Sequence, residues 1–197
     1  YNLGTDNMSD KMKIATNLKL IYTKAFAEKH KIVLTGMAQT NDYSSTNYNS
    51  SVSGIGSVEV ADPAAGGKIT KLTSSSSSNR SVGFLANGHY NYDDRYMITA
   101  GIRYDGNSKM GRNSRWGTFP SLSGAWRVSR EVFLRDIEWI EEIKLRASWG
   151  KSGTSPSGNY SYVGTFGSDG KFMDFDVITP NSVQLNNLKW ETVSQQN

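Results

Sequence analysis

The side chains that could perform chemistry are few in this sequence, and they do not form a recognisable motif. The two histidines, His30 and His89, stand far apart in the chain, and there is no cysteine. The Gly66–Lys68 run lacks both the Ser or Thr and the upstream glycine of a phosphate-binding loop. One stretch carries three aspartates whose spacing differs from that of a calcium loop: Asp169, Asp174 and Asp176. The sequence therefore predicts no enzyme, no metal site and no cofactor.

The composition favours an all-β chain. Only 37% of the residues are hydrophobic, yet the chain holds ten Tyr, five Trp and 19 Gly. No stretch approaches the roughly 18 consecutive apolar residues of a membrane-spanning helix. A membrane barrel stays possible, because its strands show only alternating hydrophobicity over about 10 residues. The net charge of +4 is dispersed and lies beside no nucleic-acid-binding motif. It predicts a solvated surface and no nucleic-acid partner.

Alternation of apolar and polar residues is clearest in the middle of the chain. In Arg95–Asp105 every second residue is apolar or aromatic, and Ser81–Tyr92 repeats the pattern. Successive side chains of a strand point to opposite faces, so each run predicts a strand with one apolar face. Only Asp93 and Asp94 separate the two runs, which predicts a tight antiparallel connection. Further strands are expected at Met12–Lys24, Lys31–Thr40, Trp116–Ser129, Lys144–Gly150 and Leu188–Asn197.

The connections between these strands alternate between short and long. Ala25–His30 and Asp93–Asp94 are short, and Arg130–Ile143 is expected to hold a helical turn or two. The long connections are polar: residues 41–79 (with the serine run Ser74–Ser78, expected to be flexible linker), 106–115 and 151–187. Short and long connections alternate in up-and-down membrane barrels, where the long ones are outer loops.

Aromatic residues are predicted to form two groups along the apolar face. One group would lie at the short-turn end: Tyr90, Tyr92, Tyr96 and Trp126. The other would lie at the long-loop end: Tyr104, Trp116 and Trp149. Two aromatic girdles beside an apolar band, here with Ile98 and Ile102, are typical of outer-membrane barrels. By periodicity alone, the same residues could equally fill the core of a soluble, carbohydrate-binding β-sandwich.

Several ordered motifs resemble the SusC/RagA family of TonB-dependent outer-membrane transporters. Tyr92–Leu134 matches a Y-x-[DEN]-[RK]-Y motif, an Arg-x-Asp-Gly turn, a W-G-x-F-P-S run and a W-x-[IV]-S-x-E motif. Ile143–Gly153 resembles that family's L-K-L-R-A-S-[YW]-G segment, and Leu188–Asn197 its L-K-W-E segment. Asn107, Met110 and Ala125 depart from the residues common in the family.

The resemblance implies an antiparallel up-and-down transmembrane β-barrel of about 22 strands, of which this chain would supply about seven. It implies TonB-energised uptake of an oligosaccharide or peptide across the outer membrane of a Gram-negative bacterium. The TonB complex, a SusD-like surface lipoprotein and outer-membrane lipid would be the partners. The chain begins at Tyr1 without a signal peptide and contains no plug domain, so we expect residues 1–197 to be part of a longer protein.

Candidate binding residues are then the lumen-facing cations and the aromatics of the last long loop. Arg103, Arg127 and Arg146 could contact the plug or the substrate, or could pair with acidic residues of other strands. Tyr160 and Tyr162 could stack on sugars or dock the lid protein, or could pack the loop on itself.

Overall fold

The computed structural model describes residues 3–56, 62, 64, 67–134 and 141–197. The secondary structure consists of nine β-strands and one short 3-10 helix among these residues. The elements are β1 (Leu3–Phe26), β2 (His30–Ser53), β3 (Lys68–Tyr92), β4 (Tyr96–Asn107), β5 (Trp116–Arg127), η2 (Val128–Arg130), β6 (Lys144–Thr154), β7 (Thr165–Phe172), β8 (Phe175–Ser182) and β9 (Glu191–Gln196).

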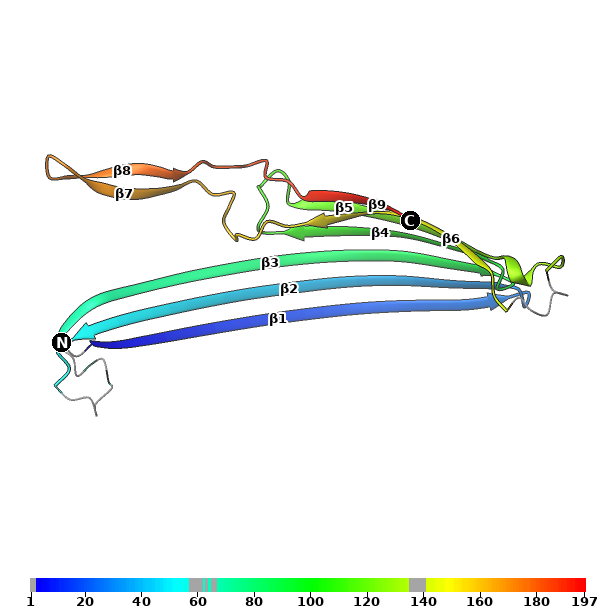
Figure 1. Ribbon diagram of the computed structural model, residues 1–197, viewed down its shortest axis with the longest axis horizontal. Coiled ribbons are helices and arrows are strands. Elements are labelled where there is room, and N and C mark those ends of the chain that lie inside the picture. Colours follow the sequence, from blue (N-terminus) through cyan, green and yellow to red (C-terminus); the bar gives the residue numbers. More distant parts are fainter. Residues whose placement is uncertain (1–2, 57–61, 63, 65–66, 135–140) are drawn as a thin grey trace. The chain divides into compact units, whose positions relative to one another are not determined.

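Seven strands form one antiparallel sheet in the order β1-β2-β3-β4-β5-β6-β9, while β7 and β8 pair only with each other (Figure 1). The order follows the chain, as in an up-and-down barrel, and the seven strands do not close on themselves. The predicted all-β, antiparallel fold is confirmed. In the described residues no helix is both long and apolar enough to span a bilayer.

The chain divides into two compact units, which we describe separately. Unit 1 comprises Tyr1–Ala15 and Asn41–Arg80. It has a small core at Val52 and Ile55, and polar side chains link its strands: Ser9 Oγ donates to Asn47 Oδ1 over 2.7 Å, and Arg80 pairs with Asp42. Unit 2 comprises Thr16–Thr40 and Ser81–Asn197, and it contains β4 to β9.

The prediction of a long connection over residues 41–79 is wrong in its extent, because the connection in the structure is much shorter. β2 continues to Ser53 and β3 already begins at Lys68, so the serine run Ser74–Ser78 is part of a strand. The sequence pattern misses these segments because they lack apolar alternation. Backbone ladders and links such as Thr70 Oγ1 to the Ser51 carbonyl, 3.0 Å, satisfy their polar groups instead. Residues 57–61, 63, 65 and 66 of this stretch lie outside the described residues.

The other connections follow the prediction more closely. The connection expected at 106–115 is shorter by two residues, because β4 continues to Asn107 and β5 starts at Trp116. The stretch 151–187 instead contains the end of β6 and the β7–β8 hairpin. Of the helical turns expected in Arg130–Ile143, the structure has η2, which ends at Arg130, while residues 135–140 lie outside the described part.

Tight turns set the register of the hairpins in unit 2. Asp93 and Asp94 both have φ of 52°, and Ala27 and Glu28 have φ of 49° and 56°. Two successive positive φ angles make a type I′ turn, whose twist matches that of the flanking strands. The predicted tight connection at Asp93–Asp94 is therefore present, and it pairs Tyr92 with Tyr96 and Phe84 with Tyr104.

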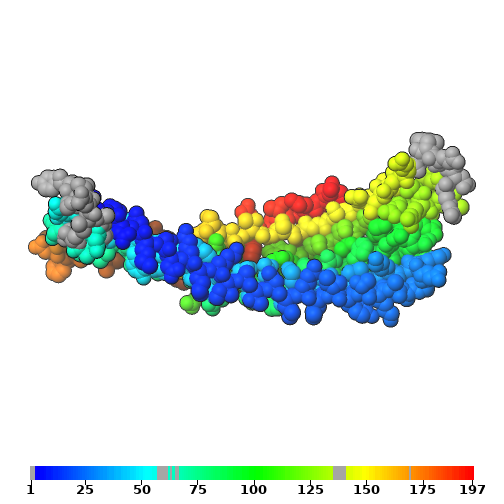
Figure 2. Space-filling model, turned by 90° about the horizontal axis from the view of Figure 1, so that it is seen from below, coloured from blue at the N-terminus to red at the C-terminus, as the bar shows by residue number. Residues whose placement is uncertain are grey.

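Pro120 lies beside the end of a ladder. The β5–β6 register runs from Ser121 paired with Gly150 to Arg127 paired with Lys144, so it stops one residue after Pro120. Proline has no N–H to donate, which explains why the ladder can end here at little cost. Beyond this point β6 continues beside β9, and Figure 2 shows β9 in red along the yellow strand β6.

Candidate functional surfaces

The apolar face of unit 2 is its more exposed face. In β4 the exposed residues alternate with half-buried ones from Tyr96 to Asp105. Ile98 is 53% exposed, Ile102 49%, Leu145 57% and Trp149 37%. These residues would be buried in the core of a soluble β-sandwich. Their exposure agrees with a sheet whose apolar side meets lipid, so the sandwich alternative receives no support.

The apolar band has the dimensions of a membrane segment. Tyr96–Tyr104 has the length of about 9 to 11 residues that a tilted transmembrane strand requires. At about 3.4 Å per residue, it rises about 27 Å along the strand. Stacked aromatic rings occupy both ends: Tyr96 lies 6.4 Å from Trp126, and Tyr104 lies 4.8 Å from Trp116. Trp149 pairs with Leu122, and Leu122 pairs with Ala100. Trp149 therefore lies in the register row of Ala100 and not in that of Tyr104.

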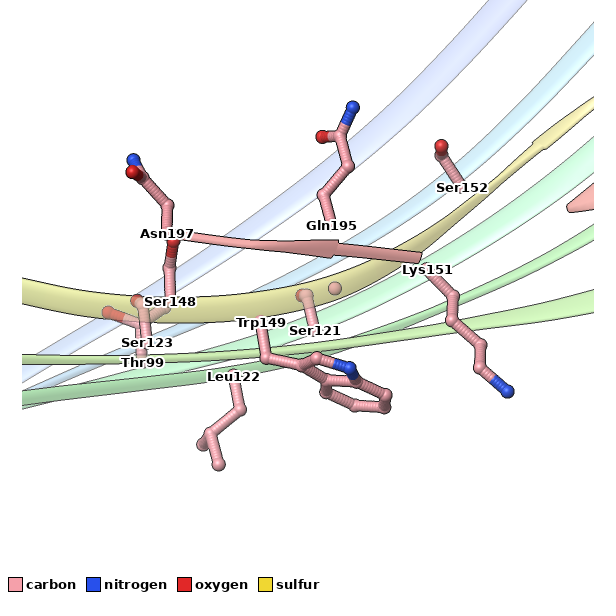
Figure 3. A pocket seen from close by; sticks show the side chains of 11 residues that line it. Thr99, Ser121, Leu122, Ser123, Ser148, Trp149, Lys151, Ser152, Gln195 and Asn197 are labelled. Carbon is pink, nitrogen blue, oxygen red and sulfur yellow. The ribbon is translucent and has the colours of Figure 1, made fainter. Parts of the chain in front are cut away.

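The opposite face carries a row of small polar side chains that crosses the strands. Register pairs connect His89 to Thr99, Thr99 to Ser123, and Ser123 to Ser148. Asn197 continues the row through backbone hydrogen bonds with Ser148. His89 Nδ1 lies 2.8 Å from Thr99 Oγ1. Figure 3 shows the side chains of Thr99, Ser123, Ser148 and Asn197 on one side of the sheet and those of Leu122 and Trp149 on the other.

The neighbouring row deepens this polar face. It contains Gly101 and Gly150, which are linked in register through Ser121. The Ser121 hydroxyl lies over Gly101, and Gly150 lines one of the hollows of this face. Two shallow hollows open here, and both are lined by Thr99, Ser123, Ser148 and Asn197. This surface offers hydroxyl and amide groups that can exchange hydrogen bonds with a polar ligand or with water.

The three predicted arginines of the polar face are not equivalent. Arg103 Nε donates to Asp105 Oδ2 over 2.6 Å, and the pair lies over Gly83, where a Cβ would overlap the Asp105 carboxylate. Arg127 Nε lies 3.2 Å from Glu142 Oε1, outside hydrogen-bond geometry. Arg146 lines one of the hollows, and it has no ion pair within the described part of the chain.

The structure groups Arg127 and Arg146 at one border of the polar face. Arg127 pairs in register with Lys144, and Arg146 follows on the same face of β6. Arg103 belongs to a different row, opposite Phe119. The arginines are therefore placed as the alternation predicts, on the polar face, while their role in substrate binding stays a prediction.

The predicted aromatics of the last long connection precede β7. Tyr160 is exposed and Tyr162 half-buried. Their backbone carbonyls accept hydrogen bonds, Tyr160 from Val163 N at 2.9 Å and Tyr162 from Leu185 N at 3.0 Å. The second bond fixes the base of the β7–β8 hairpin. A ligand-binding role for either ring stays a prediction.

The carboxylate of Glu131, at the short-turn end, has a role that the sequence pattern does not predict. Glu131 Oε1 accepts hydrogen bonds from the Tyr96 hydroxyl at 2.6 Å and from Trp126 Nε1 at 3.1 Å. Its Oε2 lies 3.5 Å from Arg95 Nη1, and its side chain is only 13% exposed. The hydrogen bonds from Tyr96 and Trp126 hold the pKa of Glu131 below its ordinary value, and Arg95 adds to this effect.

Two further ion pairs involve the β3–β4 turn: the first lies within it, and the second joins it to the segment after β5. Arg95 Nε donates to Asp93 Oδ2 over 2.9 Å, and Arg130 Nη1 to Asp94 Oδ2 over 3.2 Å. The hydrogen bond from Arg95 lowers the pKa of Asp93, and the hydrogen bond from Asn91 lowers the pKa of Asp94. No sequence signal marks this network, because its members meet only once β3, β4 and β5 are in register.

His30 also belongs to the short-turn end of the apolar face. Its ring stacks on Phe26 with a centroid distance of 4.8 Å, and its Nδ1 lies 2.7 Å from the Tyr90 hydroxyl. No group of three or more His, Cys, Asp or Glu residues that could hold a metal ion occurs among the described residues. The His30 ring packs in an aromatic cluster with Tyr90 and Tyr92.

A small core forms where the β4–β5 connection meets the segment before β9. Met110 is fully buried, and Phe119 packs edge-on against Trp190 at 5.4 Å. Gly111 N donates to the Leu188 carbonyl at 3.2 Å, and a Cβ on Gly111 would overlap the Asn186 carbonyl. The connection is therefore an ordered structure.

Comparison with known proteins identifies the family. Residues 2–197 match the family described as "TonB dependent receptor-like, beta-barrel". The chain is 36% identical over 110 residues to TonB-dependent receptor P39 of Formosa agariphila, which covers 55% of this chain and 10% of that protein. It is 30% identical over 137 residues to TonB-dependent receptor SusC of Bacteroides thetaiotaomicron, which covers 66% of this chain and 14% of that protein.

The fold agrees with a solved transporter structure. A chain of the "RagAB peptide transporter" superposes with a TM-score of 0.88 at 19% identity, and the match covers 98% of this chain and 22% of that one. The chain thus spans between about a tenth and a quarter of these relatives. The family resemblance noted in the sequence is confirmed: the chain is similar to SusC and to the RagAB structure, and it belongs to the TonB-dependent receptor-like β-barrel family.

Proposed function

We propose that this chain forms part of the barrel wall of a TonB-energised importer in the outer membrane of a Gram-negative bacterium. The cargo would be a large nutrient, an oligosaccharide or a peptide. The observation that carries the proposal is the apolar, more exposed face bounded by stacked aromatics at Tyr96 and Tyr104. A lipid environment makes such a face favourable, whereas water would leave a large apolar patch exposed.

The two faces would have different roles. The face with Ile98 and Ile102 would contact lipid, and the polar face with Thr99 and Ser123 would line the interior. Arg127 and Arg146 would be available to cargo or to a plug domain. The long connections after β2, β4 and β6 would lie on the outer side, where Tyr160 and Tyr162 could contact cargo or a SusD-like lipoprotein. Support for that partner comes from relatives named SusC and RagAB.

The experiment uses the full-length gene in its native host. We expect the protein in the outer-membrane fraction, and we expect its deletion to abolish growth on at least one oligosaccharide or oligopeptide in a panel of sole nutrients. Deleting tonB should abolish growth on the same nutrient, whereas growth on a monosaccharide or free amino acids should continue. A parent gene without a plug domain, or a protein absent from the outer membrane, would remove the proposal.

A further inference from the structure

The aromatic rings at the two ends of the apolar band differ in their hydrogen-bond partners. At the long-loop end, Tyr104 and Trp116 stack at 4.8 Å with an interplanar angle of 8°, and no described residue accepts a hydrogen bond from either ring. At the short-turn end, Tyr96 and Trp126 also stack, with an angle of 10°, but both donate to Glu131. Tyr and Trp at a membrane boundary usually present their polar atoms to the wet head-group region.

Here the protein itself supplies the acceptor. Glu131 Oε1 takes both hydrogen bonds, and Oε2 faces Arg95 at 3.5 Å. The carboxylate is mostly covered, so it needs these donors to offset its loss of water. Asp93 balances Arg95 on its other side, and Asp94 pairs with Arg130. The rings are thereby held toward the protein by a charge-assisted network.

We propose that Glu131 is a positioning residue that takes the place of lipid head groups at this boundary and fixes the rings of Tyr96 and Trp126 independently of lipid composition. It also joins the β3–β4 turn to the segment after β5, because Arg95 ends that turn and Tyr96 begins β4, whereas Glu131 follows η2. The inference rests on the proposed location of this face in a membrane. The ligand that Glu131 excludes is the lipid head group, which Tyr104 and Trp116 are free to bind.

The test uses the full-length transporter in vesicles of two compositions, one of phosphatidylcholine and one of phosphatidylethanolamine with phosphatidylglycerol. The quantity measured is the half-time of heat-induced unfolding. We expect Glu131→Leu to shorten the half-time about fivefold or more, because two donors and a cation lose their acceptor. We also expect the variant to become sensitive to the head group, with the ratio of its half-times in the two vesicles exceeding that of the unsubstituted protein at least threefold.

Two further variants separate hydrogen bonding from simple packing. Glu131→Gln keeps an oxygen acceptor and should recover most of the half-time, whereas the apolar Leu does not. Tyr96→Phe should shorten the half-time alone but add nothing to Glu131→Leu. The matched control at the other end, Tyr104→Phe, should leave the effect of Glu131→Leu unchanged.

Each alternative outcome decides a different point. The role of Glu131 is excluded if Glu131→Leu and Glu131→Gln behave alike, if Tyr96→Phe and Glu131→Leu act additively, or if head-group sensitivity stays unchanged. If the unsubstituted protein does not enter membranes at all, the proposed function fails instead. A variant that does not assemble in cells would be refolded from denaturant into both vesicles, and its refolding yield compared in the same way.

Discussion

At the scale of single residues, the clearest division is between odd and even positions of β4. Ile102 faces the exposed apolar side, and Thr99 faces the polar side, where it contacts His89.

Arginine near the middle of the lipid face of a barrel costs about 2–4 kcal/mol, while interior positions tolerate it. Ile102→Arg should therefore strongly reduce the amount of folded transporter in the outer membrane. Thr99→Arg is the matched control and should leave that amount nearly unchanged, as measured by heat-modifiable mobility on gels; equal loss in both would contradict the assignment of faces.

The acidic groups at the short-turn end predict a dependence of stability on pH. Hydrogen bonds from Tyr96 and Trp126 lower the pKa of Glu131 below the ordinary 4.5. Hydrogen bonds from Arg95 and Asn91 lower the pKa values of Asp93 and Asp94 below 3.8. A carboxyl group with a lowered folded-state pKa stabilises the fold above its unfolded pKa and loses that contribution as the pH falls through the folded value. Unfolding half-times should thus be steady from pH 8 to about 5 and shorten below about 4.

The Glu131→Gln variant tests the source of this dependence. Its side chain does not titrate, so its unfolding half-time should change less between about pH 5 and pH 3 than that of the unsubstituted protein. Parallel pH profiles for the two proteins would show that other groups cause the acid sensitivity.

At the scale of elements, the connection between β4 and β5 depends on a glycine. A Cβ on Gly111 would overlap the carbonyl of Asn186, and the loop also holds the buried Met110. Gly111→Ala should separate this connection from the segment before β9 and increase its cleavage by proteases several-fold. Gly36→Ala is the control, because nothing lies within 4 Å of a Cβ there. Unchanged cleavage in Gly111→Ala would show that the loop can relax around the methyl group.

In the turn between β1 and β2, introducing a glycine is expected to be favourable. Ala27 and Glu28 both adopt positive φ angles, of 49° and 56°. Left-handed backbone costs most residues roughly 1–2 kcal/mol, and glycine avoids that cost. Glu28→Gly should therefore leave the stability of the full-length protein unchanged or raise it by up to about 1 kcal/mol, whereas Glu28→Val should lower it. A loss of stability with glycine would mean that the Glu28 side chain contributes more than the turn geometry suggests.

Sequence periodicity predicts some elements well and misses others for a physical reason. The second half of β3, Ser81–Tyr92, and β4 are predicted with their turn, since lipid and interior impose opposite polarity on alternate residues such as Ile98 and Thr99. The far part of β2 beyond Asn41 is missed because neither face is apolar there, so no alternation arises. The β7–β8 hairpin is missed for the same reason, although its turn at Met173 and Asp174 also has two positive φ angles.

The candidate site is predicted only in part. Alternation places Arg103, Arg127 and Arg146 on one face, but it cannot show that Arg103 is already paired with Asp105. The contact between Tyr96 and Glu131 depends on the register between β4 and β5, which a local pattern does not specify. The position of Trp149 across the sheet also cannot be predicted from the sequence pattern, because it is set by the pairing of Trp149 with Leu122.

At the scale of the whole molecule, the sheet formed by the described residues has two unpaired edge strands, β1 and β9. Unpaired backbone groups at a sheet edge favour association, and they are costly in lipid. Residues 1–197 expressed alone should therefore sediment as aggregates without detergent. With detergent they should still show broad, non-cooperative unfolding, whereas the full-length protein should unfold in one sharp step. A stable, detergent-free monomer of residues 1–197 would contradict the membrane assignment of the apolar face.

The shared acceptor at Glu131 has a consequence for how relatives can diverge. If either the phenol at position 96 or the carboxylate at position 131 is replaced alone, the other loses its hydrogen-bond partner. If both are replaced together, neither polar group is left without that partner. Across an alignment of related sequences, Phe at position 96 should accompany a neutral residue at position 131. The substitutions at these two positions are thus expected to be statistically coupled, although 35 residues separate them along the chain.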